Sequence, residues 1–235
     1  MMERNDVDVT LTKFLKNIVY YALLTAVVIA AAQELGINTT SFLAVVGAAG
    51  LAIGLALKDS LANFSAGVML ILFRPFKVGD AVTVAGETGA VEEITIFNTV
   101  MNTPDNQRKI IPNGIITSGT ITNITANDTR RIDMVFGIGY DDDIKVAEKV
   151  FTDMIKADSR VLSDPAPTVA VAELADSSVN FVVRPWVKTG DYWQVKFELT
   201  EKIKMALDEA DISIPFPQQD VHMHQVVQDG EADAA

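Results

Sequence analysis

The sequence predicts a membrane protein with apolar α-helical spans near its N-terminus, followed by a small barrel-like β domain and a ferredoxin-like α+β domain. Three observations support this fold class. Two long apolar segments lie within residues 11–57, short alternating segments rich in turn residues follow Pro75, and a strand–helix–strand–strand–helix order follows about residue 129. The 235 residues are enough for more than one domain, and the absence of cysteine excludes disulfides and thiolate chemistry.

The first predicted span covers residues 11–33. The chain is almost wholly apolar from Leu11 to Ala32, and its two charges, Lys13 and Lys16, lie at the start, where they can reach the membrane surface. A helix of this length is about 33 Å long, enough to cross a bilayer. A signal peptide is the alternative, but no small-residue cleavage site is evident and a second apolar segment follows.

The second predicted span, residues 41–57, is shorter and would cover about 26 Å as a helix. The connector "QELGINTTS" between the spans has no Lys or Arg, whereas basic residues precede the first span and follow the second. The positive-inside rule therefore predicts that both chain ends are cytoplasmic. A buried helical hairpin in a soluble protein is the alternative, and two neighbouring segments of this apolarity argue against it.

Small residues form two separate faces of the second span, which the sequence marks as a pore helix. At about 100° per residue, the glycines cluster on one face, the alanines on a roughly opposite face, and two leucines lie between them. The glycines are Gly47, Gly50 and Gly54, the alanines Ala48, Ala52 and Ala56, and the leucines Leu51 and Leu55. The bulky remaining side, with Phe42, Val46, Ile53 and Leu57, suits lipid or the first span.

Opposed small faces predict that each helix packs closely against two neighbours, because small residues let helix backbones approach one another in a membrane. Contacts between unlike faces close into rings, and the leucines would then point at the ring axis. Two stacked rings formed by Leu51 and Leu55 would make a hydrophobic gate that stops ions by dewetting. A simple helix pair through Gly50 and Gly54 is the alternative.

A bend and an amphipathic helix are predicted after the pore helix. Lys58 and Asp59 would be costly deep in a bilayer, so the span should end there, and the bend is assigned to Lys58, Asp59 and Gly67. Residues 60–73 are expected to form an interfacial helix that stops at Arg74–Pro75. Its apolar positions repeat at helical spacing: Leu61, Phe64, Val68 and Leu72.

The soluble part shows no pattern typical of an enzyme or of a metal or nucleotide site. "GIGY" lacks the third glycine of a dinucleotide fingerprint, and Asp141, Asp142 and Asp143 are expected to cap the following helix rather than bind metal. His222 and His224 would share one face of a last short strand, where solvent exposure is the simpler interpretation. Residues 125–235 carry 11 basic and 21 acidic residues, which argues against nucleic-acid binding. We therefore expect no catalytic residues, metal or cofactor.

The sequence resembles the small-conductance mechanosensitive channel (MscS) family over about residues 8–227. The resemblance rests on "GAAGLAIGLALKDSLANFSAGVMLILFRPFKVGD", "IIPNG" at 110–114, "SVNFVVRPWVKTGDYW" and "ISIPFPQQDVH". It implies a homoheptamer in the bacterial inner membrane, gated by Leu51 and Leu55. Tension would open it to release ions and small solutes after hypo-osmotic shock. A membrane-anchored α+β binding or enzyme domain with non-conducting spans is the alternative.

The resemblance also sets the expected regions and two departures. The regions are a transmembrane region 1–73, a cytoplasmic β domain 74–125, a cytoplasmic α+β domain 126–217, a C-terminal barrel strand 218–228 and a disordered tail 229–235. Asp8 is expected near Arg74 or Lys77 on the cytoplasmic membrane face. Family members usually have a further N-terminal span, and this chain starts where that span would end. They also usually have glycine at the bend, where this chain has Asp59.

Overall fold

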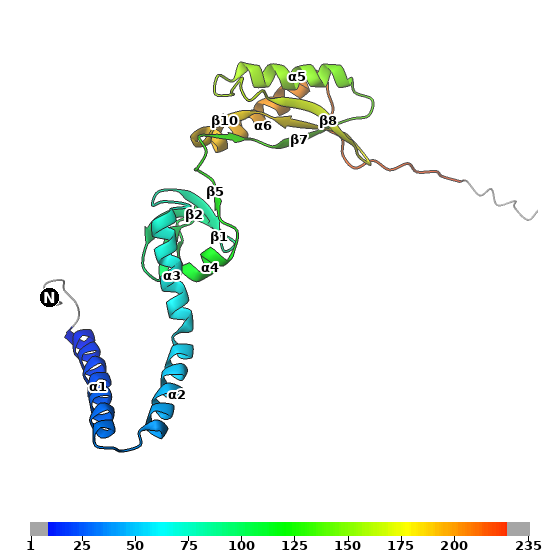
Figure 1. Ribbon diagram of the computed structural model, residues 1–235. Coiled ribbons are helices and arrows are strands. Elements are labelled where there is room, and N and C mark those ends of the chain that lie inside the picture. Colours follow the sequence, from blue (N-terminus) through cyan, green and yellow to red (C-terminus); the bar gives the residue numbers. More distant parts are fainter. Residues whose placement is uncertain (1–8, 225–235) are drawn as a thin grey trace, which may run out of the picture. The chain divides into compact units, whose positions relative to one another are not determined.

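The computed structural model describes residues 9–224, which fall into two compact units, Met1–Thr122 and Asn123–Ala235 (Figure 1). The first unit begins with three helices, α1 (Val9–Glu34), α2 (Thr40–Ala56) and α3 (Lys58–Phe73). Among the described residues, one helical stretch, Thr12–Glu34, is long and apolar enough by itself to cross a membrane. The pair α2–α3 passes the same test only as one broken helix, bent by 57°.

A five-stranded sheet, antiparallel from β1 to β4, follows α3 and forms the predicted β domain. Its strands are β1 (Ala81–Val84), β2 (Glu87–Ile94), β3 (Asn98–Asn102), β4 (Arg108–Pro112) and β5 (Thr122–Asn123), in the order β4-β3-β2-β1-β5. The two residues between β1 and β2, Ala85 (φ 51°) and Gly86 (φ 80°), both have positive φ. That conformation matches the right-handed twist of a tight hairpin.

The core of the β domain includes one residue of the helix that leads into it. Eight buried side chains make up this core: Leu70, Phe76, Val82, Val84, Val91, Met101, Ile111 and Ile116. Leu70 belongs to α3, and Ile116 belongs to the short helix α4 (Asn113–Ser118) after β4. Because burial of such a side chain is worth about 1.5–3 kcal/mol, α3 is part of the folded β domain rather than a free connector.

The second unit has the predicted strand–helix–strand–strand–helix order. After β6 (Thr129–Arg131) come β7 (Met134–Ile138), α5 (Ile144–Ala157), β8 (Thr168–Leu174), β9 (Val179–Arg184), β10 (Trp186–Lys188) and α6 (Tyr192–Glu209). The main sheet has the order β7-β9-β8 with antiparallel neighbours, and β10 pairs with β6. This is the split arrangement of a ferredoxin-like domain, so the predicted fold class is confirmed.

Both helices of the second unit share one core with the sheet. Buried side chains of α5 and α6, such as Phe151 and Leu199, cluster with Phe181 and Val183 of β9. The burial of β9 alternates strictly along the strand, as expected when one sheet face packs on helices. The predicted barrel strand 218–228 stays a prediction. Residues 218–224 form neither helix nor strand in the isolated chain, and residues 225–228 and the tail 229–235 lie outside the described residues.

Arg160 links the loop that follows α5 to helix α6. The Arg160 Nη2 atom lies 2.6 Å from a carboxylate oxygen of Asp158 and 2.6 Å from one of Glu198. Hydrogen bonds from Arg160, and then from Gln194, lower the pKa of Glu198 to about 2. The ionised carboxylate of Glu198 is therefore the form that the fold favours.

The stability contributed by Glu198 is predicted to depend on pH. Because its pKa is lower in the folded state, the contribution is complete above the unfolded pKa of about 4.5 and is lost as the pH falls toward 2. We expect Glu198→Gln to lower the thermal midpoint of the purified protein near pH 7, and the difference from wild type to shrink between pH 4.5 and 2. Glu201→Gln, an exposed position on the same helix, should leave the midpoint unchanged. A Glu198→Gln effect independent of pH would contradict the assignment.

Candidate pore helix and its attachment

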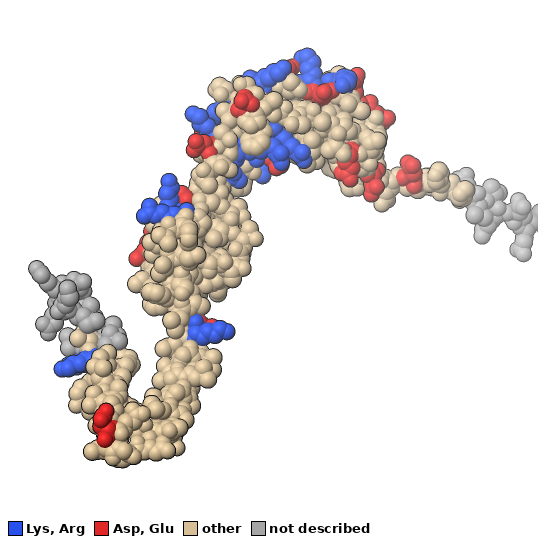
Figure 2. Space-filling view, viewed as in Figure 1, with Lys and Arg blue, Asp and Glu red and all other residues tan. Residues whose placement is uncertain are grey.

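The predicted pore helix α2 has no buried residue within the described chain. Leu51 and Leu55 are 66% and 65% exposed, and a Cβ atom built on Gly47, Gly50 or Gly54 would meet no atom within 4 Å among the described residues. The surface of α1 and α2 carries charge only near the helix ends (Figure 2). All three stripes, including Ala48, Ala52 and Ala56, are therefore open to partners outside the single chain.

The bulky side of α2 meets the first span in part. Val46, together with Leu43, lines a groove whose opposite wall is formed by α1 residues such as Ala26 and Ile29. Ile53 on the same side is 61% exposed. The glycine face, the alanine face and the predicted gate residues Leu51 and Leu55 do not line this groove. α1 therefore leaves open the surfaces of α2 that the sequence assigned to the ring.

The helix breaks at Leu57, one residue before the predicted bend. Leu57 has φ −92° and ψ 0°, and Lys58 and Asp59 are the first two residues of α3. Asp59 lies in the first turn of α3, where its negative charge interacts favourably with the positive end of the helix dipole. The backbone oxygen of Asp59 also accepts a hydrogen bond from Asn63 Nδ2 at 2.9 Å.

The break in this structure does not include Gly67, which is a buried residue within α3. A Cβ atom at this position would lie 2.2 Å from the backbone oxygen of Ile96 and 2.6 Å from Asn113 Nδ2. Real Cβ atoms do not approach backbone atoms so closely, so glycine is needed for α3 to lie against the loop between β2 and β3. In this structure Gly67 therefore packs α3 against the β domain.

The predicted apolar stripe of α3 is also offset from the face that the fold buries. Leu61, Phe64, Val68 and Leu72 are between 45% and 69% exposed, whereas Ala66, Gly67 and Leu70 are buried. Close approach to the β domain requires small residues, so the larger apolar side chains remain on the outer side. These exposed side chains are the ones available to lipid or to a neighbouring helix.

Asn113 of the "IPNG" motif ties the β2–β3 loop together. Its side chain is fully buried. Nδ2 donates to the backbone oxygens of Thr95 (3.0 Å) and Ile96 (3.2 Å), and Oδ1 accepts from Thr99 Oγ1 at 2.9 Å. The backbone N–H of Asn113 donates to the oxygen of Phe97 at 3.0 Å. The loop that receives Gly67 is thus held by one buried amide.

A second contact joins the motif to α3. The backbone N–H of Gly114 donates to Asn63 Oδ1 at 2.8 Å, and a Cβ atom at Gly114 would lie 2.9 Å from that same oxygen. We call Asn63, Gly67, Asn113 and Gly114 the α3 clamp. Sequence reasoning used "IPNG" only as a family marker and missed the clamp, although the Asn-Gly pair and a mid-helix glycine were visible in the sequence.

Arg74 and Lys77 lie where α3 joins the β domain. Arg74 ends α3 in the left-handed conformation (φ 48°, ψ 56°), and its Nε donates to the backbone oxygen of Ile71 at 3.3 Å. The backbone N–H of Lys77 donates to a carboxylate oxygen of Asp80 at 3.1 Å. Asp8 lies outside the described residues, so its predicted approach to Arg74 or Lys77 stays a prediction.

The acidic run before α5 has distinct roles at each position. Asp143 caps α5, accepting from the backbone N–H groups of Lys145 (2.7 Å) and Val146 (3.3 Å), so the predicted capping is confirmed for this residue. Asp142 instead contacts Gly139 and Ser213, and Asp141 is exposed. Within residues 9–224, no group of three His, Asp or Glu side chains is placed to hold a metal ion.

Comparisons with known proteins agree across the whole described chain. Family models for mechanosensitive ion channels match in three blocks: transmembrane helices 2/3 (residues 17–58), the beta-domain (59–126) and the MscS C-terminal region (132–214). A small-conductance mechanosensitive channel of Edwardsiella ictaluri is 49% identical, with 97% of this chain and 79% of the relative aligned. An uncharacterized MscS family protein of Synechocystis is 47% identical, with 95% of this chain and 76% of the relative aligned.

A solved structure shows the same fold. The crystal structure of Helicobacter pylori MscS in its closed state matches with a TM-score of 0.88 at 34% identity. The match covers 94% of this chain and 88% of that chain. The helices, the β domain and the α+β domain are therefore those of that structure.

Gly67→Ala is predicted to destabilise the N-terminal unit by about 1–3 kcal/mol, because a methyl group forces α3 away from the Ile96 backbone. The direction of the stability change is diagnostic, since a glycine-to-alanine substitution in an unobstructed helix would stabilise the protein by roughly 0.5–1 kcal/mol. Thermal unfolding of the purified protein measures the change. Ser65→Ala, on the exposed side of the same helix, is the control and should remain close to wild type. Equal or higher stability of Gly67→Ala would refute the close approach.

Proposed function

This chain belongs to the MscS family of mechanosensitive ion channels, and we propose that it forms a homo-oligomeric pore opened by membrane tension. The observation that carries the proposal is the state of α2. It is apolar, wholly unburied, and presents its glycine and alanine faces to open space. A helix with two vacant small faces needs two neighbours, and copies of itself supply both faces in a ring.

The same arrangement supports a gate of Leu51 and Leu55. With neighbours on the glycine and alanine faces and α1 against Val46, the leucine stripe is the side left for the axis. A narrow ring of leucines stays dry because water inside it loses hydrogen bonds that bulk water offers. Tension favours the state with the larger membrane area, so helices that separate under tension would widen and wet the pore.

The α3 clamp supplies the fixed point for this motion. Since α3 is held to the β domain through Gly67 and Asn63 while α2 has no buried residue among the described residues, a change in tilt of α2 would be taken up near Leu57. The proposed topology places both chain ends in the cytoplasm and α3 along the inner membrane surface, close to lipid. In this setting Asp8 would pair with Arg74 or Lys77, with an effect on gating of about 0–1 kcal/mol.

The biological role proposed is the release of ions and small solutes on hypo-osmotic shock, from a homoheptamer in the bacterial inner membrane. Subunit number and compartment follow from the family resemblance. The alternative, an anchored binding or enzyme domain with non-conducting spans, leaves the two vacant faces of α2 without a purpose, because an anchor requires only hydrophobicity.

Leu55→Ser and Leu51→Ser are predicted to lower the tension threshold and to cause leak, because each adds a hydroxyl to every subunit at the dry constriction. Single-channel recording from liposomes under suction measures both effects. Ile53→Ser is the matched control, since Ile53 lies on the bulky side of α2. Leu57 is unsuitable as a control, because serine at the start of α3 would also strengthen its N-cap. Leak through Ile53→Ser, together with normal gating of both leucine variants, would contradict the assignment of Leu51 and Leu55 as the gate.

Gly54→Leu and Ala52→Leu are predicted to wedge neighbouring α2 helices apart, since the vacant faces accept only close contacts. We expect fewer intact oligomers by native mass spectrometry, or an altered tension threshold where oligomers form. Ile53→Leu, on the exposed bulky side of α2, introduces the same residue outside both small faces and should assemble normally. Wild-type assembly and gating of both Gly54→Leu and Ala52→Leu would contradict the proposed ring packing.

A further inference from the structure

The chain leaves α6 through a defined turn. Asp211 adopts the left-handed conformation (φ 59°), its N–H donates to Asp208 O at 3.2 Å, and the N–H of Ile212 donates to Leu207 O at 2.9 Å. These two bonds form a Schellman motif. Ile212 is 6% exposed and belongs to the core of the α+β domain. The backbone is thus firmly placed where residue 213 begins.

Ser213 then enters a socket formed by Gly139 and Asp142. Asp142 Oδ2 accepts from the Ser213 N–H (3.0 Å), from Ser213 Oγ (2.8 Å) and from the Gly139 N–H (2.8 Å). The Gly139 N–H also approaches the backbone oxygen of Ser213 at 3.2 Å. A Cβ atom at Gly139 would lie 2.6 Å from Ser213 Oγ, so a larger residue there would displace the serine hydroxyl from this position.

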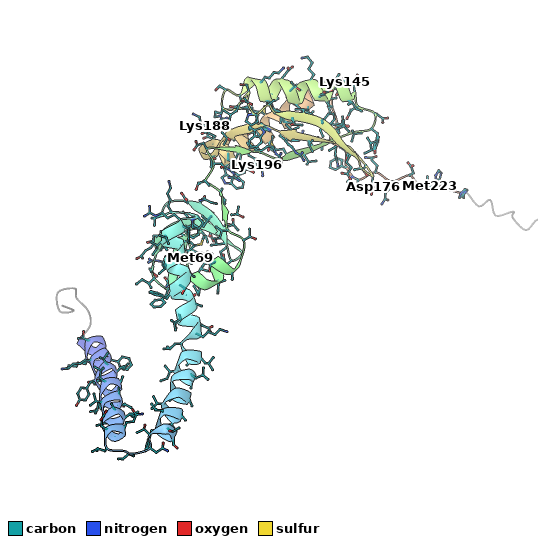
Figure 3. All side chains as sticks on the ribbon, in the orientation of Figure 1. Met69, Lys145, Asp176, Lys188, Lys196 and Met223 are labelled. Carbon is teal, nitrogen blue, oxygen red and sulfur yellow. The ribbon has the colours of Figure 1, made fainter. Side chains whose placement is uncertain are left out.

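A second attachment follows five residues later. The N–H of Gln218 donates to Ser177 Oγ at 3.1 Å, in the turn between β8 and β9. Between the two attachments the sequence is "IPFP", and each proline fixes its own φ and keeps the preceding residue extended. Figure 3 shows the chain passing the labelled Asp176 before it runs out to Met223. Residues 213–218 therefore form a stiff segment held at both ends, which we call the strut.

We propose that the strut fixes the direction in which the C-terminal strand leaves each subunit, and that Asp142 is its positioning residue. The strand, residues 218–228, is expected to pair with the strands of other copies, so this role rests on the proposed function. A strand that leaves every subunit along the same line meets its partners in register. If the strut were loosened, the C-terminal strands would leave the subunits in different directions, and assembly at this end of the chain would be weaker.

The acidic run provides matched variants for the test. Asp142 holds Ser213, Asp143 caps α5, and Asp141 is exposed, so Asp142→Ala and Asp141→Ala remove the same group from adjacent positions with different expected results. Ser213→Ala removes the hydroxyl donor and keeps the backbone N–H. Its effect should be smaller than that of Asp142→Ala, and the double variant should equal Asp142→Ala alone, because the two groups act through one contact.

The first measurement is hydrogen exchange of the full chain in nanodiscs. Loss of a charged acceptor should speed exchange of the peptide covering residues 211–218 by about tenfold or more in Asp142→Ala. Asp141→Ala should match wild type. Exchange in α5 and α6 must stay slow in Asp142→Ala, which separates a loosened strut from an unfolded domain. Equal exchange rates of the 211–218 peptide in Asp142→Ala and Asp141→Ala would contradict the claim that Asp142 holds the strut.

The second measurement is the temperature at which oligomers dissociate, followed by native mass spectrometry. We expect a lower dissociation temperature for Asp142→Ala and an unchanged one for Asp141→Ala. Faster exchange with unchanged dissociation would overturn the positioning role. A monomeric wild-type protein would instead overturn the proposed function, and the exchange comparison would still decide whether Asp142 holds the strut.

Discussion

The contact between α3 and the Ile96 backbone is the constraint on which the N-terminal unit depends. Gly67 has no side chain, and the absence of that side chain allows α3 to lie directly on a loop of the β domain. The loop in turn keeps its shape because Asn113 satisfies its backbone oxygens from inside. Removing either feature separates two elements that share the side chain of Leu70 in one core.

This constraint divides the bent helix into two halves of different character. α3 is packed, hydrogen-bonded and continuous with a folded domain, whereas α2 keeps every residue exposed in the isolated chain. The physical reason lies in what the glycines of each half contact. Glycine on α3 meets a backbone in its own chain, while the glycines of α2 meet open space. The same residue type therefore serves internal packing in one half and, as we propose, packing between subunits in the other.

Local sequence patterns predicted the apolar helices, the strand order of the α+β domain and the cap at Asp143, because each depends on residues close together in the chain. The packing role of Gly67 could not be predicted, because residues far away in the sequence determine it. The break lies at Leu57 rather than at Lys58 and Asp59, and Gly67 serves contacts with residues about 30 and 46 positions away. The stripe of Leu61, Phe64, Val68 and Leu72 is exposed, and its predicted place at the membrane interface stays a prediction, while burial on α3 follows the shape of the β domain.

The α3 clamp also bears on how the protein ages chemically. An Asn-Gly pair is the sequence most prone to deamidation, in which the glycine nitrogen attacks the asparagine amide carbon and a cyclic imide forms. In this fold the Gly114 N–H is donated to Asn63, and the Asn113 amide is held by Thr95, Ile96 and Thr99. The attacking atom and its target are each held in other contacts. The bonds that hold α3 in place thus also guard the peptide link on which they depend.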